Sequence, residues 1–264
     1  MLDADHWWLL GEAMIIKGNR ELRSLYHQLK ADDILIGTVS SKHLKKTVLL
    51  DLLERGVRCL PSALSQVLNG SKVAQAFILK DWMIPLTAVI RRRMDLIETI
   101  SRYNQHGIGP VVTKQDHMHC GHGVRKWENT ETLYNCMALA ESSYPFVLQP
   151  YVEKFSDVRV IIVGNYIESY GRQNPYNFRV NLSAGGGSRP CGLNADLEKF
   201  CRSAMERGKF PFAHIDLLNL DNGVHYVSEI ALNGGTKGAR ISRKELDQKK
   251  QELLEHLAQK RRSH

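Results

Sequence analysis

Residues 213–230 read AHIDLLNLDNGVHYVSEI, and this stretch says more about the fold than any other. Its two apolar runs, Ala213–Leu218 and Val224–Ile230, have the length and residue types of strands. Between them, positions 221–223 hold Asp, Asn and Gly, which favour a tight turn. The stretch therefore predicts a β-hairpin.

Each strand of this hairpin carries a carboxylate in apolar surroundings, Asp216 in the first and Glu229 near the end of the second. Burying a carboxylate is costly unless it is paired or binds a cation. With the amide oxygen of Asn233 close behind, the two carboxylates form an oxygen set that suits Mg²⁺ carrying phosphate. The alternative is a structural salt bridge to Arg172 or Arg179.

Charged residues alternate with apolar ones on the strands predicted before the hairpin, at 157–163, 166–172 and 177–182. Alternation with period two directs one set of side chains to the core and the other to a common open face. The polar set includes Asp157, Arg159, Arg172, Arg179 and Asn181. Several arginines on adjoining strands, followed by glycines at 185–187, predict an anion site; the alternative is a solvated surface.

A lysine follows another predicted strand, which runs from Pro110 to Lys114. The loop after it, residues 115–124 (QDHMHCGHGV), contains Gly121 and Gly123. An ammonium beside a glycine loop can hold phosphates together with exposed backbone N–H groups, although a Gly-x-Gly pair is often just a turn. The two common nucleotide motifs, GxxxxGK[ST] and a GxGxxG after the first strand, do not occur.

Residues 146–153 (FVLQPYVE) predict a strand that runs into an irregular, partly polar segment. Such a segment can offer backbone hydrogen bonds to a purine and a carboxylate to a ribose, or it is an ordinary strand end. The candidate nucleotide contacts here are Gln149, Tyr151, Val152 and Glu153.

The N-terminal part predicts an α/β arrangement. Residues 33–39 (DILIGTV) are typical of a buried parallel strand, a helix pattern ends at Gly56, and a second strand covers Val57 to Leu60. Strand, helix and strand in this order make a βαβ unit. Further helices are expected at 72–81, 94–106, 194–207 and 243–262, so the whole chain combines α/β and α+β parts.

The composition is that of a soluble globular protein: 43% hydrophobic and 24% charged in 264 residues. No window approaches the roughly 18 apolar residues of a membrane helix, and a secretory signal is not indicated, so we expect no membrane association. The five cysteines show no Cys-x-x-Cys pair, which favours a reducing cytoplasm. The net charge of +8 suits nucleic acid or phosphate ligands, but a solvated helix face and basic tail are favoured over nucleic-acid binding.

Two local features allow further interpretations. His117, His119, Cys120 and His122 could ligate Zn²⁺, but their spacing matches no standard zinc pattern, and histidines near a triphosphate are the simpler interpretation. The tryptophans at 7 and 8 suggest a partner surface, and homo-oligomerisation through this end is a hypothesis.

Taken in order, these motifs resemble the ATP-grasp superfamily, with spacing closest to RimK-like ligases, from about Leu60 to Ile241. The resemblance adds Lys72 as a nucleotide contact, since residues 69–72 (NGSK) and 83–87 (MIPLT) look like the helix region that supplies the family's lysine. It implies an ATP-grasp fold, in which two α+β subdomains clasp ATP. The implied division is a short α/β domain over 1–68, the ATP-grasp domain over 69–242 and a basic helix over 243–264.

The resemblance also implies an activity: with ATP and Mg²⁺ (Mn²⁺ as a substitute), a carboxylate becomes an acyl phosphate that an amine attacks. The substrates would be small-molecule or peptide carboxylates and amines. The family usually carries Glu-x-Asn, whereas here Ala231 follows Glu229 and Asn233 lies two residues further on. Either Asn233 reaches the metal or one ligand is missing. Two alternatives therefore stay open, a nucleotide-binding regulatory protein that has lost ligation and a small-molecule phosphotransferase.

Overall fold

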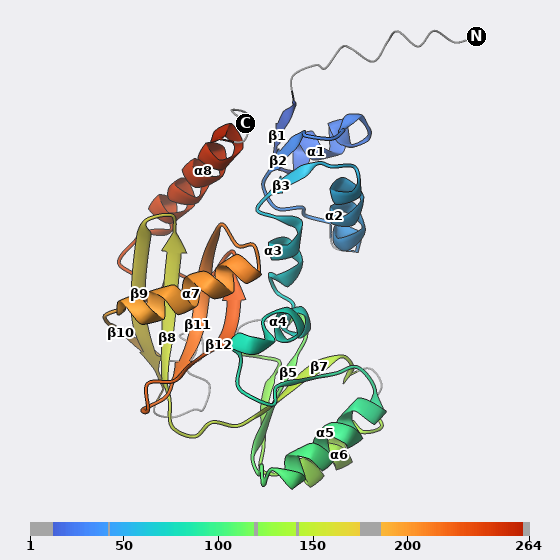
Figure 1. The fold of residues 1–264 in the computed structure, drawn as a ribbon, viewed down its shortest axis with the longest axis vertical. Helices are drawn as coiled ribbons and strands as arrows, with labels where there is room; N and C mark the ends of the chain where they lie inside the picture. Colours follow the sequence, from blue (N-terminus) through green and yellow to red (C-terminus); the bar gives the residue numbers. More distant parts are fainter. Residues whose placement is uncertain (1–12, 42, 119–120, 141–142, 175–185, 261–264) are drawn as a thin grey trace, which may run out of the picture. The chain divides into compact units, whose positions relative to one another are not determined.

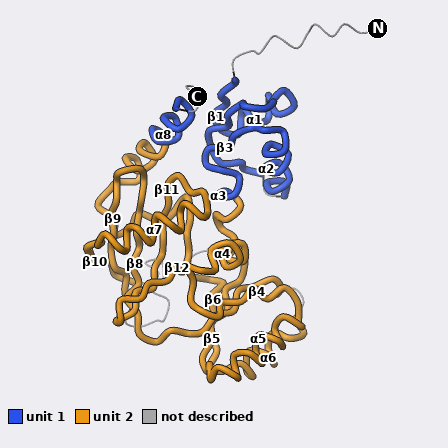
Figure 2. The backbone as a smooth tube through the Cα atoms, viewed as in Figure 1, with its two compact units in different colours: residues 1–66, 251–264 blue, residues 67–250 orange. Residues whose placement is uncertain are grey.

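A computed structural model describes residues 13–41, 43–118, 121–140, 143–174 and 186–260. The chain divides into two compact units, residues 1–66 with 251–264 and residues 67–250 (Figure 2).

The first unit is built on a parallel sheet in the order β1-β2-β3. Its strands are β1 (Ile15–Lys17), β2 (Ile34–Ile36) and β3 (Arg58–Leu60), and its helices include α1 (Gly18–Leu25), the 3₁₀ helix η1 (Tyr26–Gln28) and α2 (Lys45–Glu54). All three residues of β2 are buried, as its continuous apolar sequence predicts. The predicted βαβ unit is confirmed, and β1 with α1 adds a second one before it.

The second unit contains an antiparallel sheet in the order β4-β7-β5-β6. Its strands are β4 (Ala88–Ile90), β5 (Val111–Gln115), β6 (Val124–Trp127) and β7 (Phe146–Pro150). One face packs on α5 (Arg93–Gln105) and α6 (Thr130–Met137) through a core that includes Tyr103, Phe146 and Leu148. Val147 alternates to the opposite face and packs against Ala76 of α4 (Lys72–Ile78).

A second antiparallel sheet of this unit has the order β10-β9-β8-β11-β12. Its strands are β8 (Ser156–Val163), β9 (Tyr166–Gln173), β10 (Gly187–Pro190), β11 (Phe212–Asn219) and β12 (His225–Ala231). Helix α7 (Ala195–Arg207) lies across it (Figure 1). The side chain of Asn194 begins α7 by accepting a hydrogen bond from the backbone N–H of Leu197 at 2.8 Å.

Helix α8 (Arg243–Lys260) belongs to both units, which divide between Lys250 and Gln251. Lys250 is buried and donates hydrogen bonds to the carbonyl of Leu232 at 2.8 Å and to Oδ1 of Asn233 at 3.0 Å. In the first unit, Glu255 forms a salt bridge with Lys17 at 2.6 Å.

The α+β class with an N-terminal parallel sheet is confirmed, with local differences from the sequence-based expectations. The helix expected at 72–81 ends at Ile78, and a separate 3₁₀ helix η2 (Lys80–Trp82) follows. The sequence did not predict β6, α6 or β10, nor the helix α3 (Ala63–Leu68) that precedes α4. The strand expected at 177–182 lies outside the described residues.

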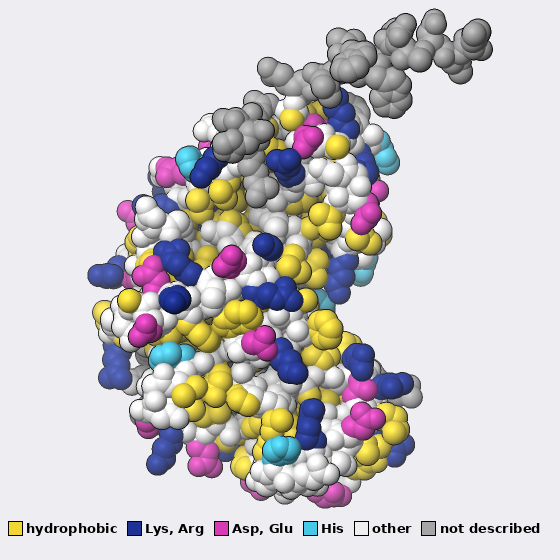
Figure 3. Space-filling view, in the orientation of Figure 1, with side chains coloured by type: hydrophobic (Ala, Val, Ile, Leu, Met, Phe, Trp, Pro, Cys, Tyr) yellow, Lys and Arg dark blue, Asp and Glu magenta, His cyan; other side chains and the backbone are white. Residues whose placement is uncertain are grey.

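No helix in the described part of the chain is both long and apolar enough to cross a membrane. On the face shown in Figure 3, Lys and Arg side chains are interspersed with Asp and Glu, as on an ordinary solvated surface.

Candidate nucleotide and metal site

One pocket of the second unit, with about 830 Å³ of space partly open to solvent, gathers most of the predicted site residues. Apolar side chains of Ile84, Val112 and Leu218 line part of it, which suits the flat faces of a base. The predicted residues that line it are Lys72, Lys114, Gly121, Gln149, Tyr151, Val152, Asp157, Arg172, Asp216 and Glu229. Residues that are up to 157 positions apart in sequence therefore meet in one place.

Three predicted residues do not line this pocket. Gly123 is buried, and a Cβ there would lie 2.6 Å from Cβ of Met118 and 2.9 Å from Cβ of Gln115, so this glycine lets the loop pack closely. Glu153 is exposed, and Asn233 binds Lys250 through Oδ1. Arg179 and Asn181 lie outside the described residues. The functional roles of all five remain predictions.

Asp216 and Glu229 lie directly opposite each other on β11 and β12. The register between these strands shifts at the step from Asp216 to Leu217, so a local irregularity follows the carboxylate. Cross-strand partners project from the same face of a sheet, and both residues line the pocket. The hairpin that the sequence predicted thus brings its two carboxylates together.

Arg172 joins two carboxylates, that of the buried Asp157 and that of the partly buried Asp216. Its Nε lies 2.5 Å from Oδ1 of Asp157, and its Nη2 lies 3.0 Å from Oδ2 of Asp216. The side chain of Arg172 is only 3% exposed, so these contacts are made with little screening by water. The alternative of a structural salt bridge between Asp216 and Arg172 is therefore present, and it does not prevent Asp216 from lining the pocket.

Arg159 is one of the arginines from which the sequence predicted an anion site, and in the structure it is paired with a carboxylate. Its Nε and Nη2 donate to the two oxygens of Asp216 at 2.7 and 2.8 Å, and its Nη1 donates to the carbonyl of Gly235 at 3.3 Å. Arg159 lies two residues after Asp157 on β8, and this spacing puts both side chains on the same face of the strand.

Burial and these guanidinium groups shift the two carboxyl groups in opposite directions. Burial raises the pKa of Asp157, with Arg172 opposing it and the charge of Asp216 adding to it. Burial also acts to raise the pKa of Asp216, but Arg159 and Arg172 outweigh it and hold that pKa well below its usual range. Asp216 therefore keeps its charge to a lower pH than Asp157 does.

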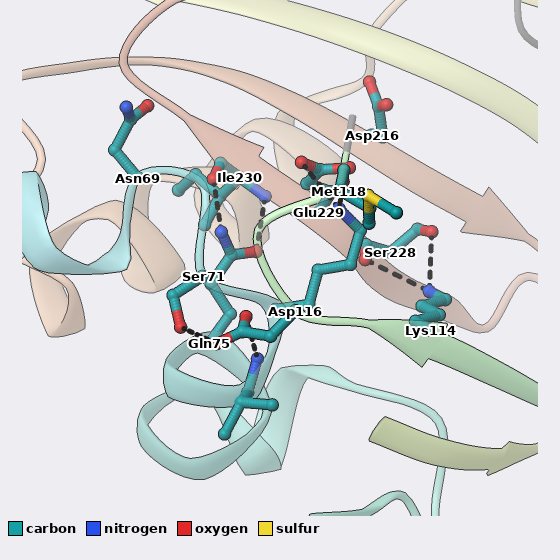
Figure 4. Close-up of polar contacts among 12 residues, drawn as sticks. Asn69, Ser71, Gln75, Lys114, Asp116, Met118, Asp216, Ser228, Glu229 and Ile230 are labelled. Carbon is teal, nitrogen blue, oxygen red and sulfur yellow. Dashed lines mark hydrogen bonds and ion pairs between the residues drawn. The ribbon is translucent and has the colours of Figure 1, made fainter. Parts of the chain in front are cut away.

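Lys72 lies beside the carboxylate of Glu229, and Lys114 lies beside Ser228 of the same strand (Figure 4 shows Lys114). Nζ of Lys72 lies 3.6 Å from Oε1 of Glu229 and donates a hydrogen bond to the carbonyl of Met118 at 2.5 Å. Nζ of Lys114 donates to the hydroxyl of Ser228 at 3.1 Å and to its carbonyl at 3.3 Å. Burial and, to a smaller extent, the charge of Lys72 lower the pKa of Lys114 to about 8, against the opposing effect of Glu229.

The start of α4 is fixed by two side chains. The hydroxyl of Ser71 accepts from the backbone N–H of Ala74 at 3.1 Å, as a helix-capping serine does. Asp116, in the glycine-containing loop, accepts from the N–H of Val73 at 3.2 Å and from the Ser71 hydroxyl at 3.1 Å (Figure 4). These bonds attach the loop to the helix that carries Lys72.

The described residues hold no group of three or more His, Cys, Asp or Glu side chains placed to bind a metal ion. His119 and Cys120 lie outside those residues, so the zinc alternative in this loop is not tested.

A sequence model of the RimK-like ATP-grasp domain matches residues 69–254. The chain belongs to the RimK-like ATP-grasp family. Its members are ATP-grasp carboxylate–amine ligases, which use ATP and Mg²⁺. No match was found among curated protein sequences.

Solved structures show the ATP-grasp fold as well. D-alanine–D-alanine ligase from Bacillus anthracis complexed with ATP is similar with a TM-score of 0.60 and 15% identity, over 92% of this chain and 84% of that one. The ATP-grasp ligase PsnB, complexed with a phosphomimetic variant of a minimal precursor, Mg and ADP, is similar with a TM-score of 0.55 and 18% identity. The likeness covers 78% of this chain and 67% of that one. An ADP complex of purK, N5-carboxyaminoimidazole ribonucleotide synthetase, is similar with a TM-score of 0.60 and 12% identity. The likeness covers 83% of this chain, which spans 58% of that longer one. At these identities the likeness to each structure concerns the fold alone.

Proposed function

We propose that this RimK-like ATP-grasp protein is an ATP- and Mg²⁺-dependent ligase that joins a carboxylate to an amine through an acyl phosphate. The observation that carries the proposal is the cross-strand pair Asp216 and Glu229, which lines one pocket together with Lys72 and Lys114. Two carboxylates and two ammonium groups at one end of an otherwise partly apolar pocket suit a nucleoside triphosphate with its cation.

ATP would lie with its base beside Gln149, Tyr151 and Val152 and with its phosphates toward Lys72 and Lys114. Gln149 is the second-last residue of β7, and Tyr151 and Val152 follow the strand, where backbone groups leave the sheet and can bond to a purine edge. Gly121 lines the same pocket and would let a backbone N–H approach the phosphates. The roles proposed for Glu153 (ribose), Gly123, Asp157 and Asn181 are supported by the sequence pattern and the family resemblance.

The residues at the phosphate end fit Mg²⁺. Mg²⁺ prefers oxygen ligands and is commonly held by one or two carboxylates together with substrate phosphates. Asp216 and Glu229 would supply these carboxylates, and the cation would neutralise charge on the phosphates. Asn233 is proposed as a further ligand from the sequence, and in the structure its Oδ1 accepts a hydrogen bond from Lys250.

Phosphoryl transfer to a carboxylate depends mainly on positioning and on neutralising charge, so it requires no nucleophilic side chain of the protein. Arg172 would stabilise the phosphoryl group in flight and then the acyl phosphate, because its buried guanidinium lines the pocket. Arg179 is proposed for the same role from the sequence. The amine would then attack the acyl carbon and release phosphate.

Hydroxylamine provides the direct test, because it captures acyl phosphates as hydroxamates without the natural amine. The protein would be incubated with Mg²⁺, ATP, hydroxylamine and pools of small-molecule and peptide carboxylates, and ADP and hydroxamates would be measured. Hydroxamate formed with equal amounts of ADP supports the proposal. ADP with a stably phosphorylated acceptor would favour a phosphotransferase, and nucleotide binding with no ADP from any pool would favour a regulatory protein.

Lys114 allows the proposal to be tested by measuring proton uptake when a nucleotide binds. At pH 8.5, above its lowered pKa of about 8, Lys114 is mostly neutral in the free protein. Bound phosphates favour the ammonium, so we expect nucleotide binding to take up protons, and the heat of binding to differ between buffers of different ionisation enthalpy.

The matched variants for this measurement are Lys114→Arg and Lys154→Arg. Arginine is charged throughout this pH range, so Lys114→Arg should lose the proton uptake, whereas Lys154 is exposed and outside the pocket lining, and its variant should keep it. Equal heats in both buffers for the unmodified protein would contradict the assignment of Lys114 to the phosphates.

A further inference from the structure

Strand β12, which carries Glu229, is the last strand of its sheet. An end strand presents a row of backbone N–H and C=O groups that no neighbouring strand can satisfy. In β12 and the residue after it, this row includes groups of Ser228, Ile230 and Leu232, at the spacing of two expected along one strand edge.

Side chains from outside the sheet satisfy this edge (Figure 4). Nε2 of Gln75 donates to the carbonyl of Ile230 at 2.8 Å, and Oε1 of Gln75 accepts from the N–H of Ile230 at 3.0 Å. Oδ1 of Asn69 accepts from the N–H of Leu232 at 2.8 Å, and Lys114 donates to the carbonyl of Ser228 at 3.3 Å. The carboxamide of Gln75 thus pairs with Ile230 as the backbone of a neighbouring strand would.

Gln75 is deeply buried for a polar residue. It is 1% exposed, its partner Ile230 is fully buried, and its Nε2 also donates to the carbonyl of Leu68 at 2.8 Å. Hydrogen bonds in such surroundings are protected from competition by water, and removing the side chain would leave buried backbone groups without partners. The contact between α4 and β12 is therefore specified by an amide rather than by apolar packing alone.

The position of this amide links it to the proposed ligand site. Gln75 is three residues after Lys72 on α4, so both side chains lie on the same side of the helix. On β12, Ile230 is the residue next to Glu229. The pair Gln75–Ile230 therefore sets the register at which Lys72 and Glu229 face each other at 3.6 Å.

We propose that Gln75 is a positioning residue for the metal–nucleotide site: by pairing with the edge of β12 it holds the carboxylate of Glu229 and the ammonium of Lys72 in register. Asn69 supports the same edge one step further along. This inference rests on the proposed function, since it concerns how the proposed cation and phosphate groups are held.

The test compares two buried glutamines. Gln66 is also 1% exposed and also makes three hydrogen bonds, with Val39, Gly37 and Pro61, but all in the first unit. Gln75→Met and Gln66→Met would be studied with Mn²⁺ and a non-hydrolysable ATP analogue, and free Mn²⁺ would be measured by electron paramagnetic resonance well below both melting temperatures.

We expect the dissociation constant of Mn²⁺ in the presence of the analogue to rise about tenfold in Gln75→Met and to stay within about twofold of the unmodified protein in Gln66→Met. A change that only reflects lost stability would affect both variants alike. An Mn²⁺ affinity of Gln75→Met within twofold of the unmodified protein, or an equal loss in Gln66→Met, would overturn the inference.

A second pair covers the case in which Gln75→Met does not fold. Asn69→Ala removes the acceptor for Leu232, whereas Asn69→Asp keeps an oxygen there, so only the first should weaken Mn²⁺ binding. Equal Mn²⁺ affinities of these two variants would overturn the inference. If the unmodified protein itself bound no Mn²⁺ with the analogue, the proposed function would fail, which is a distinct outcome from a failure of the variants to differ.

Discussion

Replacing Glu229 by Gln is expected to lower ATP turnover by about a thousandfold while leaving the fold intact. The substitution removes a negative charge that would hold the cation on the phosphates, and several kcal/mol of charge stabilisation correspond to about this factor. The side chain of Glu229 is 31% exposed, so the shape-conserving amide should be tolerated by the fold. The measurement is ADP release with an active carboxylate, beside the melting temperature.

Glu206→Gln is the matched control, because Glu206 is an exposed carboxylate on α7 that is absent from the pocket lining. It should turn over ATP at the rate of the unmodified protein. Turnover by Glu229→Gln within tenfold of that rate would show that Glu229 does not hold the cation.

Replacing Arg172 by Met is expected to give the largest loss of stability, about 3–5 kcal/mol in the free energy of unfolding near pH 8. The guanidinium contacts both Asp157 and Asp216, and without it the buried Asp157 loses its ion-pair partner while Asp216 keeps only Arg159. Urea unfolding of both proteins measures this difference.

The same difference should shrink as the pH falls to 5. The folded-state pKa of Asp157 already lies above its usual value because of burial, so acidification favours the folded protein as this group takes up a proton. Without Arg172 that pKa rises further, and the variant gains more from acidification than the unmodified protein does.

Arg202→Met is the control for this experiment. Arg202 forms a surface salt bridge with Glu198 at 2.8 Å, in which both side chains are more than a third exposed, and its loss should cost at most about 1 kcal/mol. The role given to Arg172 would be contradicted if Arg172→Met lost no more free energy of unfolding than Arg202→Met. It would also be contradicted if the loss in Arg172→Met did not change with pH.

The parts of the site that the sequence predicted well are those within one strand or one hairpin. The strands predicted at 213–218 and 224–230 differ from β11 and β12 by one residue at each end, because a clear apolar pattern is interrupted by a strong turn. Lys114 and Gln149 were found because each lies at the end of a recognisable apolar strand.

The parts that could not be predicted depend on which strands become neighbours. Arg159 contacts Asp216 because β8 pairs with β11, 57 residues further along the chain, and no local pattern fixes that pairing. Gln75 likewise finds Ile230 at a separation of 155 residues. In β6, residues 124–127 (VRKW) offer too few apolar residues to indicate a strand, which forms because β5 provides an adjacent edge.

Helix α8 has a consequence for how the protein can be divided experimentally. Lys250 bonds to the residues that follow β12, and five residues later Glu255 bonds to Lys17 near the start of the described chain. Neither compact unit can therefore be produced as a separate fragment without cutting a continuous helix, and a deletion from the C-terminus would first remove a partner of the N-terminal sheet.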